Sequence, residues 1–209
     1  MKKNFLLGVD EAGRGSWAGP VVAGVCALRK DLKYPFTSLL NDSKKLSPKK
    51  REEIFDMIQE SMKIGTCFGG IGVVSSEIID QVGIREANRL AMQKALQQVL
   101  SQIGDNFESI KIDGRDNYSF ENINQKKLEY IIRGDGFVPE IQAASILAKV
   151  SRDTIMKEFS KTYSNYGFEK HKGYGTRLHE ELLSIHRPSD IHRKSYAPIK
   201  KLILEEEFI

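Results

Sequence analysis

The sequence predicts an α/β fold in which a mixed, partly parallel sheet is flanked by helices and followed by a small helical C-terminal lobe. Short apolar runs that are typical of strands alternate with longer runs of helical periodicity, and this alternation favours a sheet with parallel strand pairs. Three strand-like runs end in an aspartate, and basic residues gather toward the C-terminus. With 209 residues, 40% of them hydrophobic, the chain can bury a substantial core.

The first part of the chain predicts three strands and one helix. Residues 4–9 and 21–28 are short apolar runs on either side of a glycine-rich turn, and both are expected to be buried strands. Ser47 and Pro48 mark a helix start, with the serine as N-cap and the proline as the first helical residue. Residues 66–74 predict a strand that is weakened by glycines.

The second part begins with a regular amphipathic pattern. One apolar stripe predicts a helix over residues 84–103. Residues 109–113 and 128–135 predict two further strands, and residues 139–159 predict a long, strongly apolar helix. From about Tyr163 the pattern is one of short helices and loops.

The domain organisation follows from the absence of any linker or internal repeat. We expect an α/β core over residues 1–160 that continues directly into a helical C-terminal lobe over residues 161–209. No apolar stretch approaches 18 residues, and Asp10 interrupts the N-terminal one, so we expect a cytoplasmic protein without a membrane span or signal peptide. We expect the protein to be a monomer. Cys26 and Cys67 lie in strand-like runs and are expected to be buried free thiols.

The distribution of charge indicates a possible partner. The net charge is only +4, but residues 141–201 hold twelve Lys and Arg against six Asp and Glu, together with all four histidines. Such an excess favours a surface that faces a polyanion. A solvated helical surface explains the same excess equally well.

Acidic residues stand at the ends of the strand-like runs. Asp10, Asp113 and Asp135 each end one, and Glu11 follows Asp10. Ends of parallel strands meet at one edge of a sheet, and carboxylates gathered there repel one another unless a cation compensates them. Oxygen-only clusters suit Mg²⁺ or Mn²⁺, and two such ions could hydrolyse a phosphodiester. Asp113 and Asp135 also adjoin glycines, so turn chemistry is the alternative. Asp153, within a helix, is expected to be an exposed surface carboxylate.

The glycine-rich loop does not match the common nucleotide-binding motifs. Gly13, Gly15 and Gly19 are one residue too widely spaced for a dinucleotide fingerprint, and no phosphate-binding loop motif occurs. A bare phosphate cradle next to Asp10 and Glu11 would also be electrostatically unfavourable. A divalent cation between these acids and a phosphate removes that objection.

Several motifs together resemble a known family. The segments "GVDEAGRGSWAGPV", "LNDSKKLS", "KIDG", "RGD", "AASILAKVSRD" and "HKGYGT" occur in the order found in ribonuclease HII, and the resemblance extends from about residue 7 to 198. It implies a ribonuclease H-like catalytic core over residues 1–160, a substrate-binding lobe over residues 161–209, and a metal-dependent endonuclease that cuts the RNA strand of RNA/DNA hybrids. The implied enzyme also cuts 5′ to ribonucleotides embedded in duplex DNA, leaving a 5′-phosphate and a 3′-hydroxyl. The implied catalytic and metal-binding residues are Asp10, Glu11, Asp113 and Asp135.

The resemblance also implies substrate contacts. The backbone of Gly13, Arg14 and Gly15 would approach the ribose 2′-hydroxyl, the group that distinguishes RNA from DNA. Tyr174 would stack on the deoxyribose that follows the ribonucleotide. The remaining candidates would contact backbone phosphates and are Lys44, Lys45, Lys149, His171 and Lys172.

Two residues depart from the family motif. Ser16 and Trp17 stand where the family more often has a proline and a smaller aliphatic residue, and Trp17 would either pack against the lobe or alter the fit of the substrate.

Two rival functions remain. One rival is a ribonuclease HIII-like enzyme, although Asp10 stands too near the start for the N-terminal extension of that class. The other is a non-catalytic nucleic-acid-binding protein, which would have no use for acids facing a polyanion.

Overall fold

A mixed five-stranded sheet forms the centre of the molecule. The computed structural model describes residues 4–40 and 46–206. The strands are β1 (Phe5–Ala12), β2 (Val21–Arg29), β3 (Cys67–Val74), β4 (Phe107–Asp113) and β5 (Leu128–Ile131), and their order across the sheet is β3-β2-β1-β4-β5. The pairs β1/β2 and β2/β3 are antiparallel, whereas β1/β4 and β4/β5 are parallel. The prediction of a mixed, partly parallel sheet is confirmed.

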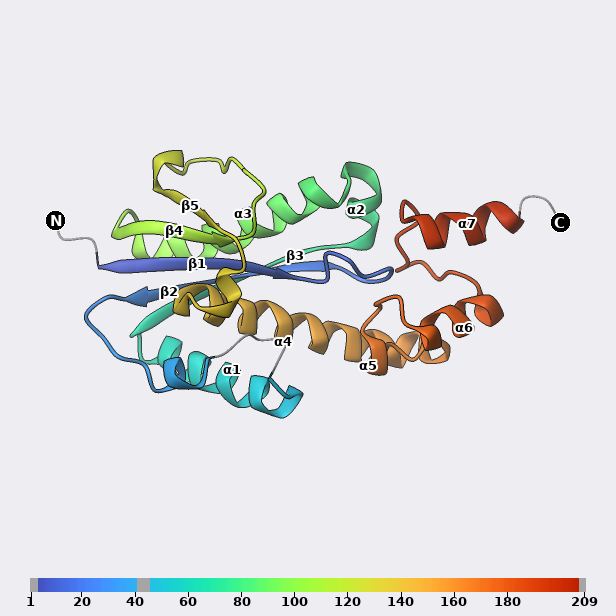
Figure 1. The fold of residues 1–209 in the computed structure, drawn as a ribbon, viewed down its shortest axis with the longest axis horizontal. Coiled ribbons are helices and arrows are strands. Elements are labelled where there is room, and N and C mark those ends of the chain that lie inside the picture. Colours follow the sequence, from blue (N-terminus) through green and yellow to red (C-terminus); the bar gives the residue numbers. More distant parts are fainter. Residues whose placement is uncertain (1–3, 41–45, 207–209) are drawn as a thin grey trace.

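Helices cover both faces of this sheet. They are α1 (Pro48–Lys63), α2 (Ser76–Val82), α3 (Ile84–Ile103), α4 (Pro139–Thr162), α5 (Phe168–His171), α6 (Arg177–His186) and α7 (Ala197–Glu206). Helix α3 packs on one face against β3 and β2, and α4 packs on the other against β1 and β2 (Figure 1). Helix α1 packs outside α4, and the short helices α5, α6 and α7 gather at one end of the molecule (Figure 1).

Local chemistry accounts for the helix that was expected after residue 47. Ser47 is its N-cap and accepts a hydrogen bond from the Lys50 amide, and Pro48 is the first helical residue. Its buried face includes Ile54 and Ile58, which pack into a hydrophobic cluster between α1, α4 and the sheet. Cys26 and Cys67 lie in the same cluster as buried free thiols, as expected.

Glycines in the strands allow α4 to lie close to the sheet. A Cβ on Gly8 of β1 would stand 2.0 Å from the Glu140 carbonyl carbon, and one on Gly24 of β2 would stand 2.3 Å from the Ala144 carbonyl oxygen. Helix backbone therefore contacts strand backbone directly, with no side chain between them. This contact fixes the position of α4 relative to β1.

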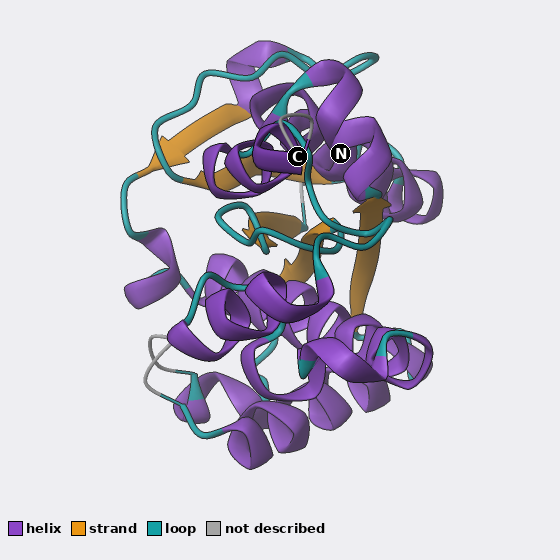
Figure 2. Ribbon diagram, turned by 90° about the vertical axis from the view of Figure 1, so that its right-hand side faces the viewer, coloured by secondary structure: helices purple, strands orange, loops and turns teal. Residues whose placement is uncertain are grey.

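The C-terminal helices have a hydrophobic cluster of their own. Its buried members are Ala18, Met156, Tyr166, Phe168, Leu183, Ile191 and Ile199. Met156 belongs to α4, which runs from the sheet through residue 160 into this region (Figures 1 and 2). The separate cluster is consistent with a C-terminal lobe, while the boundary at 160/161 falls inside a continuous helix and stays a prediction. None of the helices in the described ranges has the length and hydropathy needed to cross a membrane.

Two local expectations differ from the structure. The strand predicted over residues 128–135 ends at Ile131, because Arg133 adopts a left-handed conformation (φ +59°) and residues 134–136 form a 3-10 turn. Helix α2 was not predicted, since seven residues are too few to establish a helical period. The expected helix over residues 84–103 has the bounds of α3.

Candidate active site

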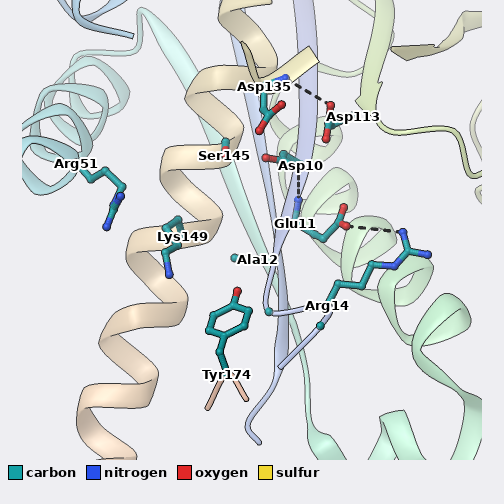
Figure 3. Close-up of a pocket in the computed structure, with 12 residues that line it drawn as sticks. Asp10, Glu11, Ala12, Arg14, Arg51, Asp113, Asp135, Ser145, Lys149 and Tyr174 are labelled. Atoms are coloured by element: carbon teal, nitrogen blue, oxygen red, sulfur yellow. Dashed lines mark hydrogen bonds and ion pairs between the residues drawn. The ribbon is translucent and has the colours of Figure 1, made fainter. Parts of the chain in front are cut away.

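Three of the four predicted acids meet where β1 and β4 lie side by side. Asp10 lies in β1, Asp113 is the last residue of β4, and Asp135 lies in the 3-10 turn after β5. One carboxylate oxygen from each lies within 4.8 Å of the others (Figure 3). The Asp135 amide also donates a hydrogen bond to Asp113 Oδ1 over 3.4 Å. The parallel β1/β4 pair thus brings together residues 103 positions apart (113 − 10).

Asp10 and Asp135 are the buried members of this acidic triad, Asp10, Asp113 and Asp135, and Asp113 is partly exposed. The exposed fraction of Asp10 is 6%, and its carboxylate accepts hydrogen bonds from the Glu11 amide at 2.7 Å and from the Ser145 side chain of α4. Burial, followed by the charge of Glu11, raises the pKa of Asp10 well above its usual range. Among the described residues no Lys, Arg or His forms an ion pair with Asp10, so a bound cation is the natural compensation for its charge.

Glu11 points to the other face of the sheet, because β1 continues past Asp10 to Ala12. Its carboxylate hydrogen-bonds with Asn88 of α3 and lies 3.8 Å from Arg14 Nη1. Burial raises the pKa of Glu11, while the Arg14 charge lowers it. Arg14 is held in turn by Asp116, with 2.6 Å between Nη1 and Oδ2. Glu11 therefore lies beside the acidic triad but outside its close oxygen cluster.

A cleft joins the triad to most of the predicted substrate residues. Its lining residues are Asp10, Glu11, Ala12, Gly13, Arg14, Gly15, Arg51, Asp113, Asp135, Ser145, Lys149 and Tyr174 (Figure 3). Arg51 and Ser145 were not predicted. The four-residue spacing of Ser145 and Lys149 on one helix face is the signal that could have identified the serine.

Lys149 and Tyr174 lie together on the side of the cleft formed by α4. Lys149 Nζ is 5.6 Å from the centre of the Tyr174 ring, and Arg152 Cζ is 5.1 Å from it on the same helix. Lys149 also forms an ion pair of 2.7 Å with Asp153. The expectation that Asp153 is exposed was wrong, since 19% of its side chain is exposed and the carboxylate is used to orient Lys149.

Trp17 packs against the C-terminal region. Its ring lies 5.6 Å from that of His179, and a Cβ on Gly175 would stand 2.2 Å from it. The first of the two expectations for Trp17 is therefore confirmed. The Trp17 amide donates a hydrogen bond to the Gly173 carbonyl over 2.8 Å, so the glycine-rich loop and the segment that carries Tyr174 are joined directly.

Of the other phosphate-contact candidates, the structure describes His171 and Lys172. Lys44 and Lys45 lie outside the described residues. His171 is buried, its Nε2 lies 2.7 Å from the Tyr166 carbonyl oxygen and its Nδ1 accepts from the Gly173 amide. Both ring nitrogens are thus engaged within the protein, and a phosphate contact of His171 stays a prediction. Lys172 is half-buried, and its ammonium donates to the Glu169 carbonyl.

Comparison with known proteins identifies the family. The profile of the family described as Ribonuclease HII matches residues 7–199. The chain belongs to the ribonuclease HII family. Ribonuclease HII of Chlamydia pneumoniae is 46% identical over 199 residues, which cover 95% of this chain and 86% of that protein. Ribonuclease HII of Endomicrobium trichonymphae is 45% identical over 198 residues, covering 95% of this chain and 88% of its own length.

Solved structures agree in fold. Ribonuclease H2 from Pyrococcus horikoshii superimposes with a TM-score of 0.73 at 25% identity, covering 98% of both chains. Bst-RNase HIII in complex with Mn²⁺ gives a TM-score of 0.73 at 15% identity and covers 72% of its own chain, a likeness of fold alone. The ribonuclease H-like fold is therefore confirmed. Membership of the ribonuclease HII family makes the chain a metal-dependent endoribonuclease that acts on RNA/DNA substrates.

Proposed function

We propose that this enzyme cuts 5′ to ribonucleotides embedded in duplex DNA and within RNA/DNA hybrids, leaving a 5′-phosphate and a 3′-hydroxyl, and so serves to remove ribonucleotides from DNA. The observation that carries the proposal is the position of the acidic triad in the same cleft as Gly13, Arg14 and Gly15. A phosphodiester at the triad places the adjoining sugar next to this loop. We further propose that the enzyme acts as a monomer in the cytoplasm.

The residues of the triad fit Mg²⁺ or Mn²⁺. They offer carboxylate oxygens within 4.8 Å of one another, and hard divalent cations prefer such ligands. When bound, a pair of such ions would activate a water and stabilise the leaving oxygen of the phosphodiester. We propose Asp10, Asp113 and Asp135 as direct ligands. Glu11, beside them in the cleft, is the fourth proposed ligand and is oriented by Asn88 and Arg14.

The other residues of the cleft would position the substrate. Ser145 orients Asp10, and Lys149 and Arg51 place positive charge beside the path of the nucleic-acid backbone. The proposed contact of Tyr174 is with the deoxyribose after the ribonucleotide, since its ring lines the same cleft as the triad and lies beside Lys149 of α4. Backbone amides of the Gly13–Gly15 loop would read the 2′-hydroxyl. Lys44, Lys45 and Lys172 remain proposed phosphate contacts.

Cleavage of duplex DNA that holds one ribonucleotide tests this proposal. With Mg²⁺ or Mn²⁺, wild-type enzyme should cut 5′ to the ribonucleotide, and Asp10→Asn should be slower by about a thousandfold or more, equivalent to roughly 4 kcal/mol of barrier. Asp56→Asn, an exposed acid on α1, is the matched control and should cut at the wild-type rate. If wild type cuts long hybrids but spares the single ribonucleotide, the proposed substrate is wrong. If Asp10→Asn cuts normally, the proposed metal site is wrong.

A further inference from the structure

Two arginines are completely buried beneath the glycine-rich loop. Arg152 of α4 and Arg193, which precedes α7, both have exposed fractions of 0%. Among the described residues neither lies within ion-pair distance of a carboxylate. A buried charge without a counter-ion is costly unless strong hydrogen bonds compensate it. The hydrogen bonds of these two side chains therefore indicate their role in the structure.

Arg193 donates three hydrogen bonds to carbonyls of the loop. Nη2 donates to the Gly13 carbonyl at 2.7 Å, Nη1 to the Arg14 carbonyl at 3.0 Å, and Nε to the Gly19 carbonyl at 3.0 Å. Tyr196 adds a fourth, since its hydroxyl donates to the Arg14 carbonyl at 2.6 Å while accepting from Arg193 Nη1 at 2.9 Å. Only a guanidinium offers donors in a planar fork that can serve several carbonyls together.

Arg152 supports the same loop from its other side. Nη2 donates to Ser16 Oγ at 2.7 Å, Nε donates to the Pro20 carbonyl at 3.0 Å, and Ser16 Oγ donates to the Gly13 carbonyl at 2.9 Å. Gly13 lies against this guanidinium, because a Cβ there would stand 1.9 Å from Arg152 Nε. The Gly13 carbonyl is therefore directed into the protein by contacts from both arginines, one direct and one through Ser16.

Fixing the carbonyls also fixes the amides. In a trans peptide the N–H points opposite to the C=O, so inward carbonyls on Gly13 and Arg14 turn the N–H groups of Arg14 and Gly15 outward. Both residues line the cleft beside the acidic triad. Within residues 4–40 and 46–206, neither of these N–H groups donates a hydrogen bond to another protein atom. Two oriented donors are thus available to an oxygen of the substrate.

We propose that Arg193 and Tyr196 are positioning residues that set the discrimination of this enzyme between ribose and deoxyribose. They hold the Gly13 and Arg14 carbonyls inside the protein and so direct the Arg14 and Gly15 amides to the 2′-hydroxyl. The inference rests on the proposed function of this loop. It assigns a role in sugar recognition to Arg193 and Tyr196, which lie about 180 positions further along the chain than the loop.

Paired binding measurements test the assignment. Dissociation constants are measured for two duplexes of the same sequence, one all-DNA and one with a single ribonucleotide, in Ca²⁺ in place of Mg²⁺, with each duplex verified as uncut afterwards. Tyr196→Phe removes only the hydroxyl, and Arg193→Lys keeps the charge but loses the fork. The dissociation constant of the all-DNA duplex divided by that of the ribonucleotide-containing duplex measures the discrimination. This ratio should fall about threefold to tenfold in each variant, as expected for losing a hydrogen bond that orients the loop.

Tyr34→Phe is the matched control. It removes a tyrosine hydroxyl that donates to the Thr66 carbonyl at 2.7 Å, beside α1 and away from the cleft, and should leave the ratio unchanged. If wild type discriminates and both Tyr196→Phe and Arg193→Lys retain its ratio, the inference is wrong while the proposed function stands. If wild type binds both duplexes equally, the proposed role of the loop fails and the inference with it. Should Arg193→Lys not fold, Tyr196→Phe alone decides.

Discussion

At the scale of single residues, the strongest sequence signal was the pair Asp10 and Glu11. Strand alternation required their side chains to face opposite sides of the sheet, and the structure confirms this, with Asp10 toward Ser145 of α4 and Glu11 toward Asn88 of α3. Local patterns could not identify Arg193 as a partner of Gly13, because 180 residues separate them and an arginine in a basic segment resembles a surface residue. Its role depends on burial, which only the fold determines.

The acidic triad should destabilise the protein when no metal is bound. Asp10→Asn removes a buried charge next to Asp113 and is expected to raise the unfolding free energy by about 1 kcal/mol in the presence of EDTA. Mg²⁺ should raise the melting temperature of wild type and have little effect on the variant. Thermal unfolding with EDTA and with Mg²⁺ measures both effects, and Asp56→Asn controls for the change in net charge. A lower melting temperature for Asp10→Asn in EDTA would contradict the prediction.

At the scale of elements, long regular patterns were predicted well and short ones poorly. The helices expected over residues 84–103 and 139–159 correspond to α3 and α4, because their apolar faces repeat over many turns. The strand expected over 128–135 was too long, since Arg133 and the following glycines favour a turn over an extended chain. Asp135 nevertheless reaches the triad, because a turn at the end of β5 lies at the same edge of the sheet.

The contact between α4 and β2 should tolerate no side chain at Gly24. A Cβ there would lie 2.3 Å from the Ala144 carbonyl oxygen, and helix backbone cannot move aside without disturbing the packing on β1. Gly24→Ala is expected to lower the unfolding free energy by about 2 to 3 kcal/mol, as other overpacked cores do. Urea denaturation measures the change. Gly136→Ala, where a Cβ meets no atom within 4 Å, is the control, and equal effects in the two variants would contradict the prediction.

At the scale of the whole molecule, the C-terminal region joins the core through buried polar groups as well as through hydrophobic packing. The Ser189 amide donates to His192 Nδ1, which leaves the His192 proton on Nε2 to donate to His179 Nε2 over 3.0 Å. His179 Nδ1 then donates to the Tyr174 carbonyl over 3.1 Å. Composition indicated that this region is basic, but which of its histidines are internal could not be predicted without the fold.

This arrangement requires neutral histidines and makes the fold sensitive to acid. Burial lowers the pKa of His179 to about 3 and that of His192 to about 4, and the stacked His171 ring, 4.3 Å from His179, has its pKa lowered too. In the unfolded chain His179 and His192 bind protons below about pH 6.5, whereas in the folded chain they stay neutral until the pH is much lower. Stability is therefore lost as the pH falls from about 6.5 toward 4, at up to about 1.4 kcal/mol per pH unit for each histidine.

Urea denaturation between pH 7.5 and 4.5 measures this slope. His192→Gln, whose amide can still donate toward His179, should reduce the pH dependence by about one proton relative to wild type. His186→Gln changes an exposed histidine and should leave the slope as it is. Equal slopes for His192→Gln and wild type would mean that His192 titrates normally in the folded protein.

Helix α4 carries Ser145, Lys149 and Arg152 on one face, and these residues serve Asp10, the Tyr174 side of the cleft and the glycine-rich loop respectively. Each residue added to a helix rotates everything after it by about 100°. A single insertion or deletion between Ser145 and Arg152 would therefore turn the arginine away from the loop while leaving the serine in place. Any functional descendant of this chain must therefore keep six residues between the serine and the arginine.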